Sequence, residues 1–281
     1  MTTLLLHKPY GVLSQFSPEP GSRWQTLADL VDVPAVYAAG RLDADSEGLL
    51  LLTSDGRLQQ RLTDPRFGHW RRYWVQVEGD ATTRPEALEL LRQGVTIQHV
   101  STLPARARVL AADQLAAAGI GERQPPIRQR LQIPTSWLDI ELREGRNRQI
   151  RRMTAAVGLP TLRLIRMTID LMDGRPPLSW QGLQPGAWRE VTPAESQRLA
   201  QLRHSPGRGG RAGGGKSGQG GGGGSGGLAL TLVGLAVEFA LQGLDAHGPQ
   251  AVFAATGGLQ MFLRCDRDQL DRMGPATDLD W

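Results

Sequence analysis

The 281-residue sequence contains one cysteine, Cys265. An intrachain disulfide is therefore impossible, and a reducing compartment, the cytoplasm, is the expected location. The leucine run at residues 4–6 is interrupted by His-Lys-Pro and is too short for a signal peptide. The apolar run over residues 228–244 has 17 residues and contains Glu238. A membrane helix needs about 20 apolar residues, so this run predicts a small packed element and no membrane partner.

Metal and nucleotide chemistry have little support in the sequence. The five histidines are scattered and Cys265 is remote from them, so a ligand spacing typical of a metal site is missing. Residues 210–217, GRAGGGKS, match the phosphate-loop pattern, but that motif works only between a buried strand and a helix. Here it lies inside the glycine-rich segment 205–227, whose composition is typical of a flexible linker. We therefore expect no metal and no nucleotide cofactor.

Lysine is also scarce, since Lys8 and Lys216 are the only lysines among 32 basic residues. Residues 1–204 carry 26 basic and 21 acidic side chains, so the excess of positive charge lies in this part of the chain. The planar arginine fork suits phosphate binding, but a GC-rich genome produces the same arginine bias. Charge alone thus permits a nucleic-acid partner without identifying one.

Residues 1–204 show both strand and helix periodicity. Alternation and short apolar runs predict strands near 4–8, 48–53, 71–79 and 135–143, of which 71–79 reads as half-buried. An Asp-Gly turn is expected at the end of the second strand. Helical spacing predicts helices over 57–64 and 84–94, the latter with Pro85 near its start and Gly94 at its end. This part of the chain is therefore predicted to mix α and β structure.

A cluster of arginines marks residues 142–160. Asn147 is a good N-cap and Gly158 a good stop, which predicts a helix over 148–157. At about 100° per residue, three arginines share one face and three apolar residues share the other: Arg148, Arg151 and Arg152 against Ile150, Met153 and Val157. A solvated basic face is one interpretation. Because the arginines gather at the helix start, a phosphate backbone or a buried carboxylate is the favoured partner.

Three carboxylates, Asp43, Asp45 and Glu47, lie within five residues in GRLDADSEGLLLL, residues 40–52. Asp, Ser and Gly favour tight turns through local hydrogen bonds. On residue types alone, each carboxylate either shapes a turn or reacts.

Several segments together resemble the RsuA-type pseudouridine synthases. They are HKPYGV (7–12), GRLDADSEGLLLLTSDG (40–56), RYWVQVEG (72–79) and EGRNRQIRRM (144–153), and the resemblance extends over roughly residues 3–195. It implies an α+β fold with a mixed, largely antiparallel sheet, flanking helices and a basic RNA cleft. Many relatives carry an N-terminal S4 RNA-binding module, whereas by the resemblance this chain is expected to start at the catalytic domain. Residues 1–204 are the expected catalytic domain, 205–227 a linker and 228–281 a segment without an assigned role.

The resemblance also implies roles for individual residues. Asp43 is the expected catalytic carboxylate, Tyr73 stacks on the target base and assists proton transfer, and Arg151 is the cation that keeps Asp43 ionised. Arg41 is expected to enter the space left when the uridine leaves its stack. The expected RNA-binding residues are Lys8, Arg41, Arg146, Arg148 and Arg152. Asp45 and Glu47 are left as turn residues, and Arg71 stands where a lysine is common.

The implied function is isomerisation of a specific uridine in ribosomal RNA, 23S by the resemblance, to pseudouridine. The reaction is neither a redox step nor a phosphoryl transfer, so one aspartate suffices without metal or cofactor. The expected enzyme is a monomer. One alternative is a non-catalytic RNA-binding or ribosome-assembly protein with the same fold. Another is a glycoside hydrolase, which needs two carboxyl groups about 5 to 9.5 Å apart across a sugar, a separation that one tight turn frames poorly.

Overall fold

The computed structural model describes residues 1–127, 130, 132–204, 252–254 and 260–262. The chain divides into two compact units, Met1–Gly213 and Gly214–Trp281. In the second unit the described elements are strands β12 (Val252–Ala254) and β13 (Gln260–Phe262), which pair antiparallel. The expected linker at 205–227 and the expected packed element at 228–244 lie outside the described residues.

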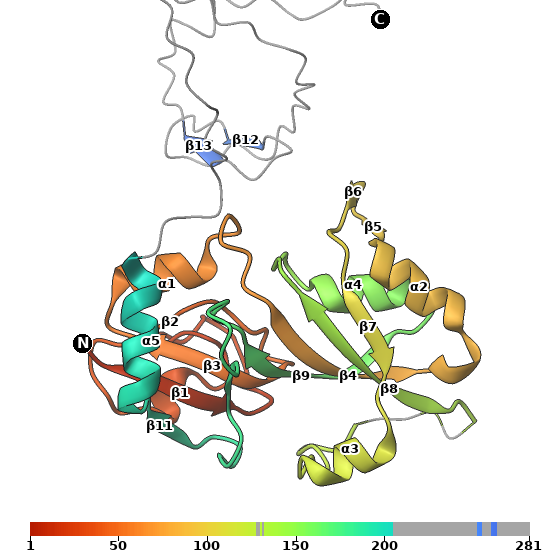
Figure 1. Ribbon diagram of the computed structural model, residues 1–281, viewed down its shortest axis with the longest axis horizontal. Coiled ribbons are helices and arrows are strands. Elements are labelled where there is room, and N and C mark those ends of the chain that lie inside the picture. Colours follow the sequence, from red (N-terminus) through yellow and green to blue (C-terminus); the bar gives the residue numbers. More distant parts are fainter. Residues whose placement is uncertain (128–129, 131, 205–251, 255–259, 263–281) are drawn as a thin grey trace, which may run out of the picture. The chain divides into compact units, whose positions relative to one another are not determined.

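The first unit is built on one twisted sheet (Figure 1). Its central path runs β11-β1-β3-β9-β4-β8-β7, with β2 beside β3 and β10 beside β9. The strands are β1 (Thr3–Lys8), β2 (Tyr37–Ala38), β3 (Glu47–Thr53), β4 (Arg71–Glu78), β7 (Arg106–Val109), β8 (Thr135–Leu142), β9 (Thr161–Ile169), β10 (Leu178–Ser179) and β11 (Trp188–Glu190). Among these described strands β3 and β9 pair parallel and the other pairs are antiparallel. The predicted mixed, largely antiparallel sheet is confirmed.

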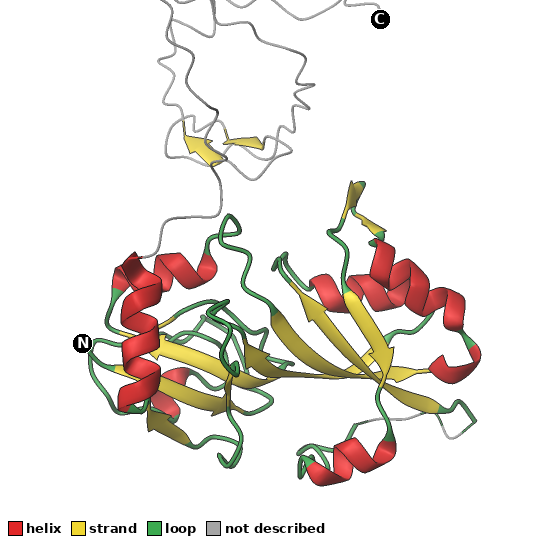
Figure 2. Ribbon diagram, in the orientation of Figure 1, coloured by secondary structure: helices red, strands yellow, loops and turns green. Residues whose placement is uncertain are grey.

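Helices flank this sheet (Figure 2). They are the short 3₁₀ turns η1 (Leu27–Asp29) and η2 (Ala81–Thr83), and the α-helices α1 (Gly56–Thr63), α2 (Pro85–Gln93), α3 (Ala112–Ala117), α4 (Gln149–Ala156) and α5 (Pro193–His204). Strands β5 (Thr96–Ile97) and β6 (Val100–Ser101) form a separate small hairpin. None of the helices in the described residues is long and apolar enough to span a membrane.

The leucine-rich strands β1 and β3 are buried on both faces. Leu4, Leu6, Leu50 and Leu52 pack with residues around η1, whereas Leu5, Leu49 and Leu51 pack with apolar residues of α1 and α5. Strand β4 was predicted to be half-buried, but its residues Tyr73–Val77 are all buried, because it is a central strand. A strand covered on both faces has little reason to alternate in polarity.

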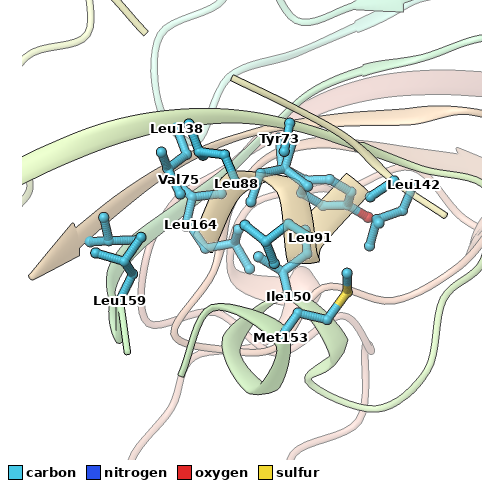
Figure 3. Close-up of a cluster of buried hydrophobic side chains, with 14 of the residues drawn as sticks. Tyr73, Val75, Leu88, Leu91, Leu138, Leu142, Ile150, Met153, Leu159 and Leu164 are labelled. Atoms are coloured by element: carbon cyan, nitrogen blue, oxygen red, sulfur yellow. The ribbon is translucent and has the colours of Figure 1, made fainter. Parts of the chain in front are cut away.

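A third cluster joins β4 and β8 to α2 and α4 (Figure 3). Ile150 and Met153 are the buried residues by which α4 contributes to it, and Leu91 comes from α2. The predicted apolar face of the arginine helix is thereby confirmed. This packing fixes the start of α4 beside the ends of β4 and β8.

Two predicted local features are wrong. Asp55-Gly56 is a helix start rather than a turn, since the Asp55 carboxylate accepts hydrogen bonds from the Arg57 and Leu58 amides at the start of α1. The N-cap of α4 is Arg148 rather than Asn147. Arg148 takes a left-handed conformation with φ 50° and ψ 32°, and the Asn147 side chain instead accepts a hydrogen bond from Arg152 at 3.0 Å.

Candidate active site

A cavity of 620 Å³ lies against the loop before β3, the strands β4 and β9, and the start of α4. Asp43 and Tyr73 both line it. Its lining contains six arginines and three acidic residues, Asp43 included. The arginines are Arg41, Arg71, Arg143, Arg146, Arg148 and Arg166. A second cavity of 330 Å³ shares Arg41, Asp43 and Arg148 with the first. Asp43 therefore lines two adjoining cavities, of which the larger has a basic lining.

The loop that carries Asp43 is held through its backbone. The Ser14 hydroxyl accepts a hydrogen bond from the Leu42 amide at 3.0 Å and donates one to the Leu42 carbonyl at 2.7 Å. The Ala44 carbonyl accepts from the Gly11 amide at 2.7 Å, and Ser46 closes a turn onto the Asp43 carbonyl at 3.0 Å. Because its polar backbone groups are tied to neighbouring elements, the loop presents Asp43 from a fixed position.

Asp43 itself is partly open to solvent, with 34% of its side chain exposed. Its charged neighbour is Arg148, whose Nη1 lies 3.5 Å from an Asp43 carboxylate oxygen. The left-handed backbone of Arg148 turns the chain at this point, immediately before α4. Such a conformation is costly for a residue other than glycine and often marks a functional site.

Asp45 binds the two arginines that the sequence assigned elsewhere. The Arg148 guanidinium donates two hydrogen bonds to the Asp45 carboxylate, of 3.2 and 2.9 Å. Arg151 donates to the Asp45 carbonyl at 2.8 Å and lies 3.4 Å from its carboxylate. Burial acts to raise the pKa of Asp45, but the Arg148 hydrogen bonds and the Arg151 charge outweigh it and lower the pKa overall. Asp45 thus orients the cations around Asp43.

The expected pairing of Arg151 with Asp43 therefore needs correction. The arginine within ion-pair distance of Asp43 is Arg148, and Arg151 is bound to Asp45. Burial lowers the pKa of Arg151, while the charges of Asp45 and Asp43 act in the opposite direction. Arg151 thus contacts the Asp43 loop through Asp45 and does not form an ion pair with Asp43 itself.

Glu47 is not a turn residue as expected. It is the first residue of β3, 5% exposed, and its carboxylate forms two hydrogen bonds of 2.8 Å with the guanidinium of buried Arg163. Gly48 follows it with φ 104°, and a Cβ there would lie 2.2 Å from the Arg166 carbonyl oxygen. Glu47 and Gly48 thus allow β3 and β9 to pack closely together behind the site.

Lys8 was expected to bind RNA, but its side chain is completely buried. Its ammonium donates to the carbonyls of Ser46 at 2.8 Å and Pro9 at 3.0 Å, so it secures the end of the Asp43 loop. Burial lowers the pKa of Lys8 to about 7. A desolvated lysine already committed to backbone carbonyls cannot reach a phosphate, and the RNA-binding assignment is wrong.

This burial gives a pH-dependent stability. Between about pH 7 and the ordinary lysine value of 10.5, unfolded Lys8 holds a proton that folded Lys8 has released, so stability rises with pH. We expect the unfolding free energy of the wild type, relative to Lys8→Met, to rise by up to about 1.4 kcal/mol per pH unit from pH 7 to 9. Denaturant melts at pH 5 to 6, where both states are protonated, supply the baseline. A difference that stays constant up to pH 9 would contradict the assignment.

Tyr73, the residue expected to contact the base, is part of the cavity wall. It is a buried residue of β4, it lines the large cavity, and it packs in the cluster with Leu142 and Ile150 (Figure 3). A register shift between Arg72 and Tyr73 interrupts the β4–β9 ladder at this point. Such irregularities often redirect side chains beside active sites.

The remaining expected RNA-binding residues divide into two groups. Arg41 and Arg146 line the cavity, where Arg41 donates to the Gln15 side chain at 3.3 Å and Arg146 to the Ser101 carbonyl at 2.9 Å. Arg152 lies apart from the cavity lining and is bound to Asn147 and Gln98. The three arginines of α4 therefore do not act as one face.

Sequence reasoning missed Ser14 and Arg166. Ser14 has no signal beyond its place in an N-terminal strand-turn segment. Arg166 had one, because an arginine inside the apolar run LRLIRMTI of β9 must be buried or interrupt the strand. In the described part of the chain, no group of three or more His, Cys, Asp or Glu residues could hold a metal ion.

Comparisons with known proteins show which family the chain belongs to. Residues 2–156 match the RNA pseudouridylate synthase family. "Ribosomal large subunit pseudouridine synthase E" of Xanthomonas campestris pv. campestris is 52% identical over 198 residues, covering 70% of this chain and 99% of that protein. The protein of the same name from Vibrio vulnificus is 49% identical over 189 residues, covering 67% and 74%.

A solved structure described as "Crystal structure of pseudouridylate synthase" matches the fold with a TM-score of 0.54 and 24% identity, covering 70% of this chain and 73% of that one. The expected pseudouridine synthase fold is thereby confirmed. The family match spans both the Asp43 loop and the arginine-rich start of α4. The chain belongs to the RNA pseudouridylate synthase family.

Proposed function

We propose that this chain converts a specific uridine of large-subunit ribosomal RNA, 23S in bacteria, to pseudouridine, with Asp43 as the reacting carboxylate. The observation that carries the proposal is the placement of Asp43 on a tied loop, opening with Tyr73 into an arginine-lined cavity. The names of the relatives support the substrate class. Residues 1–204 act as the catalytic unit, as a monomer in the cytoplasm, without metal or cofactor.

The cavity suits an extruded nucleotide. A base-modifying enzyme must take its target out of the stack and hold it between side chains. Tyr73 provides an aromatic surface in the cavity wall, and exposed Arg41 stands at the boundary shared by both hollows. Arg41 fills the gap that the extruded uridine leaves, while Arg146 binds a phosphate at the rim.

Asp43 assists cleavage of the C–N glycosidic bond by attacking the sugar or by balancing positive charge on it. It must remain ionised to do either, and Arg148 supplies the nearest positive charge. Asp45 holds Arg148 and Arg151 in place, so Arg148 stays in the cavity lining beside Asp43 and Arg151 supports the loop from behind. Tyr73 contacts the base and assists removal of the C5 proton.

Conversion by the purified full-length chain tests the proposal. Transcripts of large-subunit and small-subunit rRNA are incubated with the protein, digested to nucleosides, and analysed for pseudouridine by chromatography and mass spectrometry. We expect about one pseudouridine per large-subunit transcript and none in the small-subunit transcript. Binding without conversion of either RNA would contradict the proposal and support a non-catalytic RNA-binding protein.

Arg152 provides a test of RNA binding outside the chemistry. Within α4 it is the arginine whose side chain contacts the amide side chains of Asn147 and Gln98 rather than a carboxylate. Arg152→Gln is expected to weaken RNA binding and reduce the slope of log affinity against log salt by about 0.7 to 0.9. The matched control is Arg175→Gln, at an exposed position that lines neither cavity. Equal slopes for Arg152→Gln, Arg175→Gln and the wild type would place Arg152 off the RNA path.

A shortened chain tests the assignment of the catalytic unit. A protein ending at His204 retains the sheet, both cavities and helix α5. It is expected to fold with an unchanged melting curve and to convert uridine at the full-length rate. A folded 1–204 protein without conversion would show that residues 205–281 take part in catalysis or RNA docking.

A further inference from the structure

Arg166 lies in β9 and is 2% exposed. Its Nε donates to the Leu49 carbonyl at 2.7 Å. Its Nη2 is buried and has no hydrogen-bond partner among the described residues. An unsatisfied buried donor costs about 1–3 kcal/mol and more when it is charged. Such a group therefore calls for a reason beyond folding.

The neighbouring arginine of the same strand shows what a structural arginine looks like here. Arg163 is also buried, but its guanidinium is matched by the Glu47 carboxylate and the Gly121 carbonyl. Arg166 has no carboxylate within 4.0 Å in the part of the chain that the structure describes. Burial lowers the pKa of Arg166, the charge of Arg71 acts in the same direction, and the interaction with Tyr73, a side-chain hydrogen bond included, only partly offsets this. The protein thus maintains a desolvated cation without a counter-charge of its own.

The position of this cation is fixed from three sides. Arg166 is the direct cross-strand partner of Tyr73, so their side chains lie on the same face of the sheet. It also pairs with Gly48 of β3, where the backbones approach too closely for a Cβ. Arg166 also lines the 620 Å³ cavity, together with Asp43 and Tyr73. Arg166 and Tyr73 thus belong to the same wall of the cavity.

The chemistry of the proposed reaction supplies an anion at this place. When the C1′–N1 bond breaks, its electron pair stays with the base and the negative charge is shared by the uracil ring oxygens. Meanwhile the carboxylate of Asp43 balances the positive charge that develops on C1′. After the base turns, C5 shares an electron pair with C1′, the C5 proton leaves and N1 gains a proton. The product therefore has the same atoms and charge as the substrate.

The following inference rests on the proposed function. We propose that Arg166 is a catalytic residue that donates a hydrogen bond from Nη2 to a carbonyl oxygen of the target uracil. This hydrogen bond stabilises the negative charge on the departing base. A preformed donor in a water-poor site acts without reorganisation cost, as in an oxyanion hole. A phosphate is the less suitable partner, because Arg166 lies beside Tyr73, the residue placed to contact the base. The Arg148 side chain, at 41% exposure, is the accessible cation.

Single-turnover conversion of a large-subunit rRNA fragment at saturating enzyme tests this role. Arg166→Met is expected to slow conversion by about 10²–10³-fold with unchanged RNA affinity, the loss typical of one such donor. Arg166→Lys keeps the charge and is expected to retain more of the rate. Should melting curves show that Arg166→Met is unfolded, Arg166→Gln takes its place. Equal losses in the charged and neutral variants, or a loss confined to affinity, would overturn the proposal.

A rescue experiment separates charge from packing. Arg166→Ala is assayed with guanidinium and, separately, with urea, a planar neutral molecule of similar size, both below denaturing concentrations. Saturable rescue by guanidinium but not by urea is expected, and equal effects of both would contradict the role. The wild-type rate in the same assay distinguishes the two levels of failure. An inactive wild type removes the proposed function, whereas an active wild type with unaffected Arg166 variants removes only the role of Arg166.

Discussion

Replacing Asp43 with asparagine should bring pseudouridine formation below detection while leaving the fold and RNA affinity nearly intact. An amide fills the same volume but can neither attack the sugar nor balance a cation there. The Asp43 carbonyl that closes the turn onto Ser46 is unaffected by this change. RNA affinity is expected to stay the same or rise, because a carboxylate in an RNA cleft repels phosphate. Single-turnover conversion, a binding titration and a melting curve together check this result.

The matched control is Asp45→Asn, two residues away in the same loop. Asp45 holds Arg148 and Arg151, and an asparagine still accepts a hydrogen bond from each of them. We therefore expect a partial loss of rate, clearly smaller than that of Asp43→Asn. If Asp45→Asn were the inactive variant with an intact fold, or if Asp43→Asn converted uridine at a comparable rate, the catalytic carboxylate would be misassigned.

Glu47→Gln is expected to act on stability rather than chemistry. Its carboxylate is the buried counter-charge of Arg163, and removing one partner of a buried pair costs about 3–5 kcal/mol. Denaturant unfolding of the variant should show this loss, and the rate of conversion by the remaining folded protein should stay near that of the wild type.

The double variant Glu47→Met/Arg163→Met supplies the control for that prediction. Replacing a buried ion pair with apolar residues of similar volume is often neutral, so most of the stability should return. A Glu47→Gln protein with wild-type stability would show that the pair is not buried in solution. A stable but inactive Glu47→Gln protein would instead give Glu47 a part in the reaction.

Much of the sheet could be predicted from the sequence, because its signals are local. The alternation in β8 and the apolar run of β3 mark strands, and Pro85 and Gly94 mark the ends of α2. The apolar face of α4 also followed from its spacing. What these patterns share is that backbone periodicity alone decides them.

The electrostatic arrangement of the site could not be predicted in the same way. Lys8 looks like a surface cation in HKPYG, and only the packing of β1 against the Asp43 loop buries it. The left-handed backbone of Arg148 moves the start of α4 by one residue and brings Arg148, not Arg151, to Asp43. Glu47 and Arg163 are 116 residues apart in the chain. Such pairings depend on tertiary contacts that spacing does not encode.

Mapping pseudouridines in large-subunit rRNA from cells that lack this gene tests the central claim most directly. The same mapping is done after restoring the gene for the wild type or for Asp43→Asn, at equal protein levels. One uridine should lose its modification in the deletion strain, regain it with the wild type and remain unmodified with Asp43→Asn. An unchanged rRNA map in the deletion strain, or restoration of the site by Asp43→Asn, would contradict the account.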